Sequence, residues 1–181
     1  MLLKVSAAWA SKIIDCTLNG ILNGCHGRCC KGTSFYPSKS NIQNGVPVET
    51  CWWLGDNGCR LADIDKPIKC LLYPFVINSS DTLVLHYRAP ISICKECYNK
   101  GDKTTIENQR HNLELLFGED IVNRMIDSVL NKQRDFSFRT SQIFDDALAV
   151  ESELERNNII PIKRSEYWIE KDRITGQATL G

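Results

Sequence analysis

Nine cysteines are the residues of this 181-residue sequence with the clearest chemical potential, and they are unevenly spread. The first is Cys16 and the last is Cys97, so the C-terminal part of the chain contains none. Three of them, Cys25, Cys29 and Cys30, lie within the stretch GCHGRCCKG. A C-x₃-C spacing brings two thiolates within reach of one metal ion, and the glycines allow a tight turn between them. The stretch therefore indicates one corner of a transition-metal site.

Further thiolates must come from other segments to complete a tetrahedral site. The stretch CKEC supplies Cys94 and Cys97 as a second close pair. Cys59 and Cys70 stand singly, each beside a turn-forming residue, and Cys51 ranks with Cys97 behind the others. We therefore expect the metal ligands to come from Cys25, Cys29, Cys30, Cys59, Cys70 and Cys94.

The crowding of thiols leaves the identity of the metal open. Adjacent cysteines point their side chains apart, so we expect one of Cys29 and Cys30 to bind metal while the other packs or supports a second site. More thiolates are available than one tetrahedral zinc ion takes, so zinc and a 4Fe–4S cluster are both open. Cys16 lies in an apolar stretch and is expected in the core. A turn follows CKEC, which argues against thioredoxin-like thiol chemistry at a helix N-terminus.

Composition indicates the class of protein that would hold such a site. Apolar residues make up 43% of the chain, enough for a hydrophobic core, and 22 basic residues balance 22 acidic ones. Zero net charge does not indicate nucleic-acid binding. No apolar run is long enough to span a bilayer, and Lys4 and Lys12 interrupt the N-terminus, which predicts no signal peptide. We expect a cytoplasmic protein with reduced thiols, no membrane association and a protein as its candidate partner.

The elements that position the cysteines fall into a cysteine-cluster region, residues 1–103, and a helical region, residues 104–181. In the first region, Ile13, Ile14, Leu18, Ile21 and Leu22 recur at helical spacing, which favours a short helix that runs into the turn at Gly24. Residues 31–48 have the composition of a loop. The stretch ETCWWLGDNGCRL predicts a β-hairpin that turns at Gly55–Gly58, and TLVLHYRAPISIC predicts a further strand.

The second region has the periodicity of about three helices. Thr104 and Glu107 match a capping box for the first helix, which is predicted to end near Gly118. Two more helices are predicted over about 119–132 and 141–157. The last of them is expected to turn inward Ile143, Phe144, Ala147, Leu148, Glu151 and Leu154. The sequence thus predicts one α+β domain, in which a small, irregular, metal-stapled region packs on a C-terminal helical layer.

The cysteine pattern resembles a family described as zinc- or iron-chelating domains, whose signature is C-x₂-C-x₂-C-C. The rest of that signature reads C-x₂-L, then G-x-C, then R-P-x₂-C-R-x-Y-P-F. It is similar here to Cys51–Leu54, Gly58–Cys59 and Lys66–Phe75. A later family cysteine is matched by Cys94, and the resemblance covers less than half of the chain.

This chain departs from the family pattern at several positions. The first family cysteine is absent, with Cys16 as a distant substitute; the knuckle between Cys25 and Cys29 is one residue longer; and Lys66 replaces an arginine. The departures bear on which cysteines bind metal more than on metal binding itself. The resemblance implies zinc or an iron–sulfur cluster, the latter through members related to flagellin lysine methylases, and it names no reaction.

The sequence predicts a metal-binding protein in which zinc or an iron–sulfur cluster organises the fold and a partner-binding surface that includes Trp53. The alternative is an iron–sulfur-dependent enzyme that modifies a protein or a nucleic acid. A site closed by thiolates would favour the first function, and an iron with an open position facing a pocket would favour the second. Whether the protein is an enzyme is therefore left open.

Overall fold

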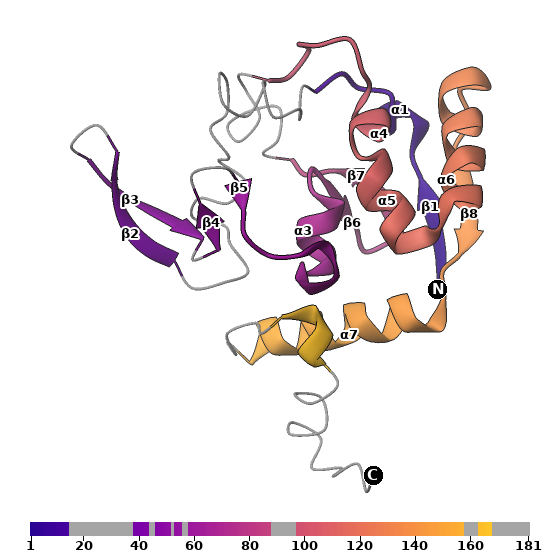
Figure 1. Cartoon of the computed structure of the whole chain (residues 1–181). Helices are drawn as coiled ribbons and strands as arrows, with labels where there is room; N and C mark the ends of the chain where they lie inside the picture. Colours follow the sequence, from indigo (N-terminus) through magenta and orange to yellow (C-terminus); the bar gives the residue numbers. More distant parts are fainter. Residues whose placement is uncertain are drawn as a thin grey trace, which may run out of the picture.

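Four strands form a mixed sheet in the order β6-β7-β1-β8 in the computed structural model of the chain (Figure 1). The structure describes residues 1–14, 38–43, 46–51, 53–55, 58–87, 97–157 and 163–167. The strands of the sheet are β1 (Leu2–Val5), β6 (Phe75–Ile77), β7 (Thr82–Leu85) and β8 (Phe136–Arg139). Strand β1 pairs in parallel with β7 and antiparallel with β8, while β6 and β7 form an antiparallel pair. This sheet and its helices confirm the α+β class.

Strand β1 lies before the predicted helix, whose supporting residues from Ile13 to Leu22 fall mostly outside the described part of the chain. Leu3 and Val5 are buried, whereas Leu2 and Lys4 are exposed, and this alternation places one face of the strand on the core. Pairing with β7 on one side and β8 on the other holds this segment extended. A single helical turn, α1 (Ala7–Ala10), follows the strand.

Three helical segments lie against the sheet, close to where the sequence predicts them. Helix α4 (Thr105–Asn108) begins with the predicted capping box of Thr104 and Glu107, which is confirmed. Helix α5 (Arg110–Phe117) ends at Gly118, whose φ of +84° is readily adopted only by glycine. The chain then continues into α6 and a π-helical turn, over Glu119–Ile126 and Asp127–Asn131.

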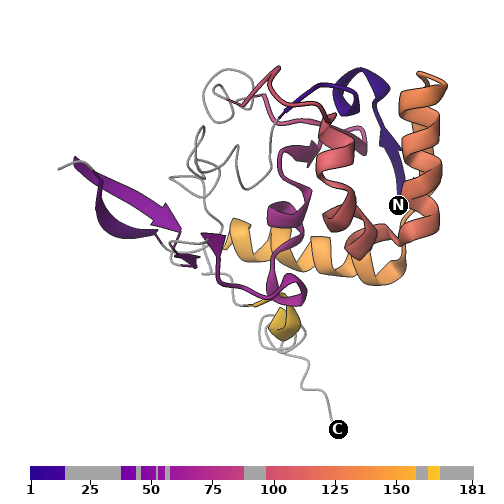
Figure 2. The ribbon, with the colours of Figure 1, turned by 45° about the horizontal axis from the view of Figure 1, so that its top comes forward.

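Helix α7 (Gln142–Arg156) is also confirmed, with Ser141 as its N-cap: the Phe144 amide donates to the Ser141 hydroxyl over 3.2 Å. It lies beside α3 in both views (Figures 1 and 2). The expectation that Ile143 faces inward is wrong, since this side chain is 73% exposed. Strand β8, between α6 and α7, was not predicted within the helical region.

The hydrophobic core joins the sheet to these helices. Phe117 of α5 lies 5.0 Å, centroid to centroid, from both Phe138 of β8 and Phe144 of α7. Leu3 and Val5 of β1 belong to the same buried cluster. The core therefore gathers segments from both halves of the sequence around the central strand.

Two small hairpins lie apart from the sheet and carry Cys51 and Cys59 (Figures 1 and 2). The first pairs β2 (Ser38–Gln43) with β3 (Val46–Cys51), so the loop predicted over residues 31–48 is wrong in this part. The second pairs β4 (Leu54–Gly55) with β5 (Gly58–Cys59), which confirms the predicted pairing of Gly55 with Gly58 in a hairpin. Cys51 belongs to the first hairpin and not to the second.

Short helical segments complete the fold near α7. The 3₁₀ turn η3 (Asp63–Asp65) leads into helix α3 (Ile68–Leu72), and a second 3₁₀ turn, η6 (Arg164–Glu166), packs against η3. Among the described segments, no helix has the length and apolar character needed to cross a membrane.

Candidate functional site

Helix α3 turns Cys70 toward solvent while it buries its apolar side. Ile68, Leu71 and Leu72 are buried, at the spacing of one helix face, so Cys70 and Lys69 fall on the opposite side. Cys70 is exposed, and so is Cys59 at the end of β5. Both predicted ligands within the described residues are therefore accessible to a metal ion.

A buried carboxylate holds α3 in place. Glu151 of α7 accepts hydrogen bonds from the backbone amides of Ile68, over 2.5 Å, and Lys69, over 3.3 Å. The Tyr167 hydroxyl donates to the same carboxylate over 2.9 Å. These bonds satisfy the first amides of α3, which have no partner inside the helix. Cys70 thus stands on a short helix whose N-terminal end is tied to α7.

The environment of Glu151 shapes its ionisation. Its side chain is fully buried. Burial raises the pKa of this carboxyl, and the hydrogen bonds from the Ile68 amide and the Tyr167 hydroxyl offset only part of that rise. The apolar period of α7 predicted that Glu151 faces inward, which is confirmed. A carboxylate among apolar inward positions needs hydrogen-bond donors, and this was the sequence signal that could have indicated the anchor.

The other two cysteines in the described part of the chain are buried. Cys97 is 2% exposed and belongs to the hydrophobic core, where a thiol packs as a small apolar side chain. Cys51, at the end of β3, is 8% exposed. Their burial agrees with their low rank as ligands.

Four of the six predicted ligands, Cys25, Cys29, Cys30 and Cys94, lie outside the described residues. Over the ranges that the structure describes, no group of three or more histidine, cysteine or acidic side chains has the arrangement to hold a metal ion. Cys59 and Cys70 are thiol donors of the kind that zinc and iron–sulfur clusters take, so the donors present fit either group in chemical type.

The two histidines that the structure describes have local roles. His111 is exposed on α5, and its Nε2 lies 3.0 Å from the Asp63 carboxylate. His86 stacks on Tyr87 with ring centroids 4.9 Å apart and lies at a tilt to Tyr73. Trp53, predicted on a partner surface, is half-buried.

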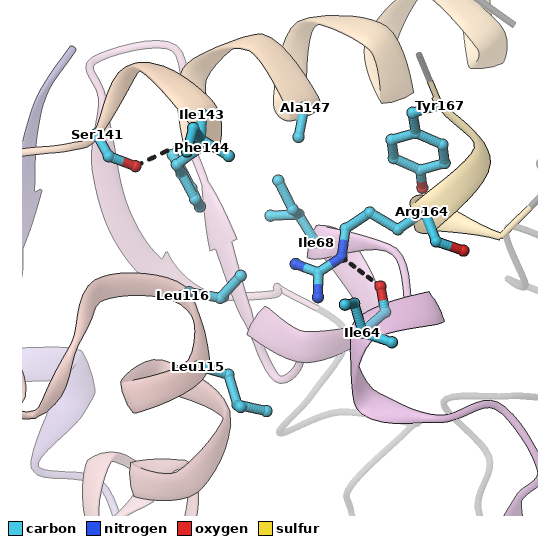
Figure 3. A pocket seen from close by; sticks show the side chains of 11 residues that line it. Ile64, Ile68, Leu115, Leu116, Ser141, Ile143, Phe144, Ala147, Arg164 and Tyr167 are labelled. Carbon is cyan, nitrogen blue, oxygen red and sulfur yellow. Dashed lines mark hydrogen bonds between the residues drawn. The ribbon is translucent and has the colours of Figure 1, made fainter. Parts of the chain in front are cut away.

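A separate apolar pocket of about 330 Å³ opens beside α3 and α7 (Figure 3). It is lined by buried side chains of α3, of α7 and of the residue that follows η6: Ile68, Phe144, Ala147 and Tyr167. The rim carries three exposed aliphatic side chains, Ile64, Leu115 and Ile143. Tyr167 links this pocket to the Glu151 anchor.

Arg164 extends its guanidinium into this pocket (Figure 3). Its Nε donates to the Ile64 carbonyl and its Nη2 to the Asp63 carbonyl, each over 3.0 Å. The pocket was not predicted from sequence, because η6 and η3 lie about a hundred residues apart in the chain and neither carries a recognisable motif.

A search of protein-family models, of curated proteins and of solved structures finds no match to this chain. The resemblance to the zinc- or iron-chelating family consequently rests on the sequence motifs alone.

Proposed function

We propose that this protein binds zinc or an iron–sulfur cluster through its cysteine cluster, with Cys59 and Cys70 among the ligands. The observation that carries the proposal is the contrast among the four described cysteines. The two that rank as ligands are exposed, on a hairpin end and on an anchored helix, whereas the two of lower rank are buried. A ligand thiol must lie where a metal ion can reach it, and the exposed Cys59 and Cys70 meet this requirement.

The form of the hairpins supports a structural role for the metal. Strands β2 and β3, and likewise β4 and β5, pair only with each other among the described strands. A two-stranded hairpin is at best marginally stable in water by itself. A bound metal ion or cluster supplies folding free energy by tying separate segments together. Cys59 and Cys70 would hold it at the junction between β5 and α3, and Glu151 would keep the Cys70 helix in position.

The decisive experiment is metal analysis of the full chain purified without oxygen, combined with a visible absorption spectrum. We expect near-stoichiometric zinc in a colourless protein, or iron with sulfide in a coloured one. Protein that contains neither metal at a near-stoichiometric level would overturn the proposal.

Substitution of one ligand tests the assignment of the cysteines. Cys70→Ser removes an exposed thiolate and should lose most of the bound metal, and with it the stability of the cysteine-bearing segments. Cys97→Ser is the matched control: it changes a buried core thiol, so it should lower the stability of the fold while each folded molecule keeps its metal. Equal metal loss in the two variants would contradict the ranking of ligands.

A further inference from the structure

The rim of the apolar pocket concentrates exposed aliphatic side chains from three separate elements. Ile64 of η3 is 68% exposed, Leu115 of α5 is 46% exposed and Ile143 of α7 is 73% exposed. Single exposed aliphatic residues are normal on a protein surface. Three that line one hollow give it an apolar rim, and such a grouping of exposed apolar side chains is typical of an interaction site.

The position of the rim favours a protein over a small ligand. A volume of about 330 Å³ is enough for one large apolar side chain. A small molecule that only filled this hollow would leave the outer faces of Ile64 and Ile143 in water. A segment of a partner chain that crosses the hollow would insert one side chain and cover the rim as well.

The charge of Arg164 identifies a second feature of that segment. Two of its N–H groups bind backbone carbonyls, and no carboxylate in the described residues forms an ion pair with it. Two acidic residues, Asp63 and Asp65, belong to the η3 turn that Arg164 contacts, but the side chain of each lies near another cation. The Asp63 carboxylate binds Lys66, over 2.6 Å, and the Asp65 carboxylate lies 3.8 Å from the Lys163 ammonium.

A purely structural role explains only part of this arrangement. By binding the carbonyls of η3, Arg164 ties η6 to η3, which accounts for its Nε and Nη2 groups. This structural role does not account for the remaining N–H groups of Arg164, which is half-buried and lies beside apolar side chains. A guanidinium in such surroundings binds a carboxylate more strongly than one in open water, because the low dielectric strengthens the attraction.

We propose that this pocket is the docking site for a segment of a partner protein that inserts a large apolar side chain among Ile64, Leu115 and Ile143 and places a carboxylate against Arg164. The segment is of the amphipathic kind that lays an apolar face into a groove. The proposal rests on the pocket residues and does not depend on the metal site, so either proposal can fail while the other stands.

The test is a selection from a random 12-residue peptide library displayed on phage, with the full-length chain as bait and the Ile143→Asp variant for counter-selection. We expect enriched peptides to carry a large apolar residue within one helical turn of Asp or Glu. A synthetic peptide from this set should bind the unmodified chain and bind Arg164→Gln about tenfold more weakly. Replacing the peptide's acid with lysine should restore binding to Arg164→Glu.

Two further variants separate docking from folding. Arg164→Lys keeps the charge but gives up the two-carbonyl clamp, so it should bind the peptide within a few-fold of the original affinity. Trp9→Ala removes an exposed apolar side chain from α1, outside the pocket, and should leave binding unchanged. Metal content should be the same in all these variants.

The proposal is overturned if no peptide is enriched, if enriched peptides lack an acid, or if Arg164→Gln binds them as well as the original chain does. It is also overturned if the pocket takes up decanoate, an apolar carboxylate probe, while no peptide is enriched. That last result would assign the pocket to a small ligand.

Discussion

The sheet-and-helix body and the cysteine-bearing hairpins are held together in different ways. In the body, β1 pairs with β7 and β8, so strands from both halves of the sequence meet in one sheet. In the hairpin region, each described strand pairs only with its neighbour in sequence. The body is therefore stabilised by burial between distant segments, whereas the hairpins depend on local pairing and on whatever ties them to the rest.

Helix α3 lies at the boundary between these two regions. Its buried side chains, Ile68 and Leu72, belong to the hydrophobic core, and its exposed Cys70 belongs to the proposed metal site. Glu151 fixes the start of this helix from the side of the body. The comparison shows how a well-packed body can present an exposed thiol through a short anchored helix.

The largest expected effect on stability comes from a cavity in the core of the sheet-and-helix body. Leu3→Ala removes a fully buried side chain from the central strand, and we expect the free energy of unfolding to fall by about 3 kcal/mol. Leu2→Ala, one residue away on the other face and 61% exposed, should change it by less than about 0.5 kcal/mol. Urea denaturation followed by circular dichroism measures both. Similar losses in the two variants would contradict the inward face assigned to β1.

A somewhat smaller effect is expected where the two regions meet. Glu151→Ala removes the acceptor for two backbone amides and the Tyr167 hydroxyl, and we expect a loss of about 2–3 kcal/mol because buried donors are left unsatisfied. Glu155→Ala is the matched control one turn later. It removes an exposed ion pair with Lys69 and should cost less than about 1 kcal/mol.

The same pair also bears on the metal proposal. If Cys70 is a ligand, Glu151→Ala should lower metal affinity, since it releases the start of the helix that carries the thiol. Glu155→Ala should leave metal content unchanged. Unchanged metal content in Glu151→Ala would show that α3 needs no anchor to present Cys70.

Sequence reasoning succeeded where the signal was local. The capping box at Thr104 and Glu107, the end of α5 at Gly118, and the pairing of Gly55 with Gly58 each depend on neighbouring residues, and all three are confirmed. Helix α7 followed from its apolar period over many turns. These features need no information about distant parts of the chain.

It failed where distant segments decide the outcome. Strand β1 was not predicted, because only its pairing with β7 and β8, far along the chain, makes it a strand. Ile143 fits the apolar spacing of α7, but no described element of the core packs over it and its side chain is exposed. The pocket requires η6 to meet η3, which no local pattern indicates. The metal site depends on four cysteines outside the described residues, so its ligand set stays a prediction.

The smallest expected effect is a pH dependence that distinguishes the buried anchor from an exposed cap. Burial raises the pKa of Glu151, so the folded chain holds this proton more tightly than the unfolded chain does. Its contribution to stability is fully present below the ordinary pKa of glutamate and is lost as the pH rises through the raised pKa. The original chain should therefore lose stability relative to Glu151→Gln as the pH rises from about 4 to about 8.

Glu107 should behave in the opposite way, and this makes it the control. Hydrogen bonds from the Thr104 hydroxyl and backbone amide hold the pKa of Glu107 below its ordinary value. Its contribution to stability is present above the ordinary pKa of glutamate and is lost as the pH falls through the lowered pKa. The original chain should therefore become more stable relative to Glu107→Gln as the pH rises. Urea denaturation across the pH range measures both differences. Slopes of the same sign would mean that Glu151 is not the buried anchor of α3, and the link between the body and the Cys70 helix would have to be sought in apolar contacts alone.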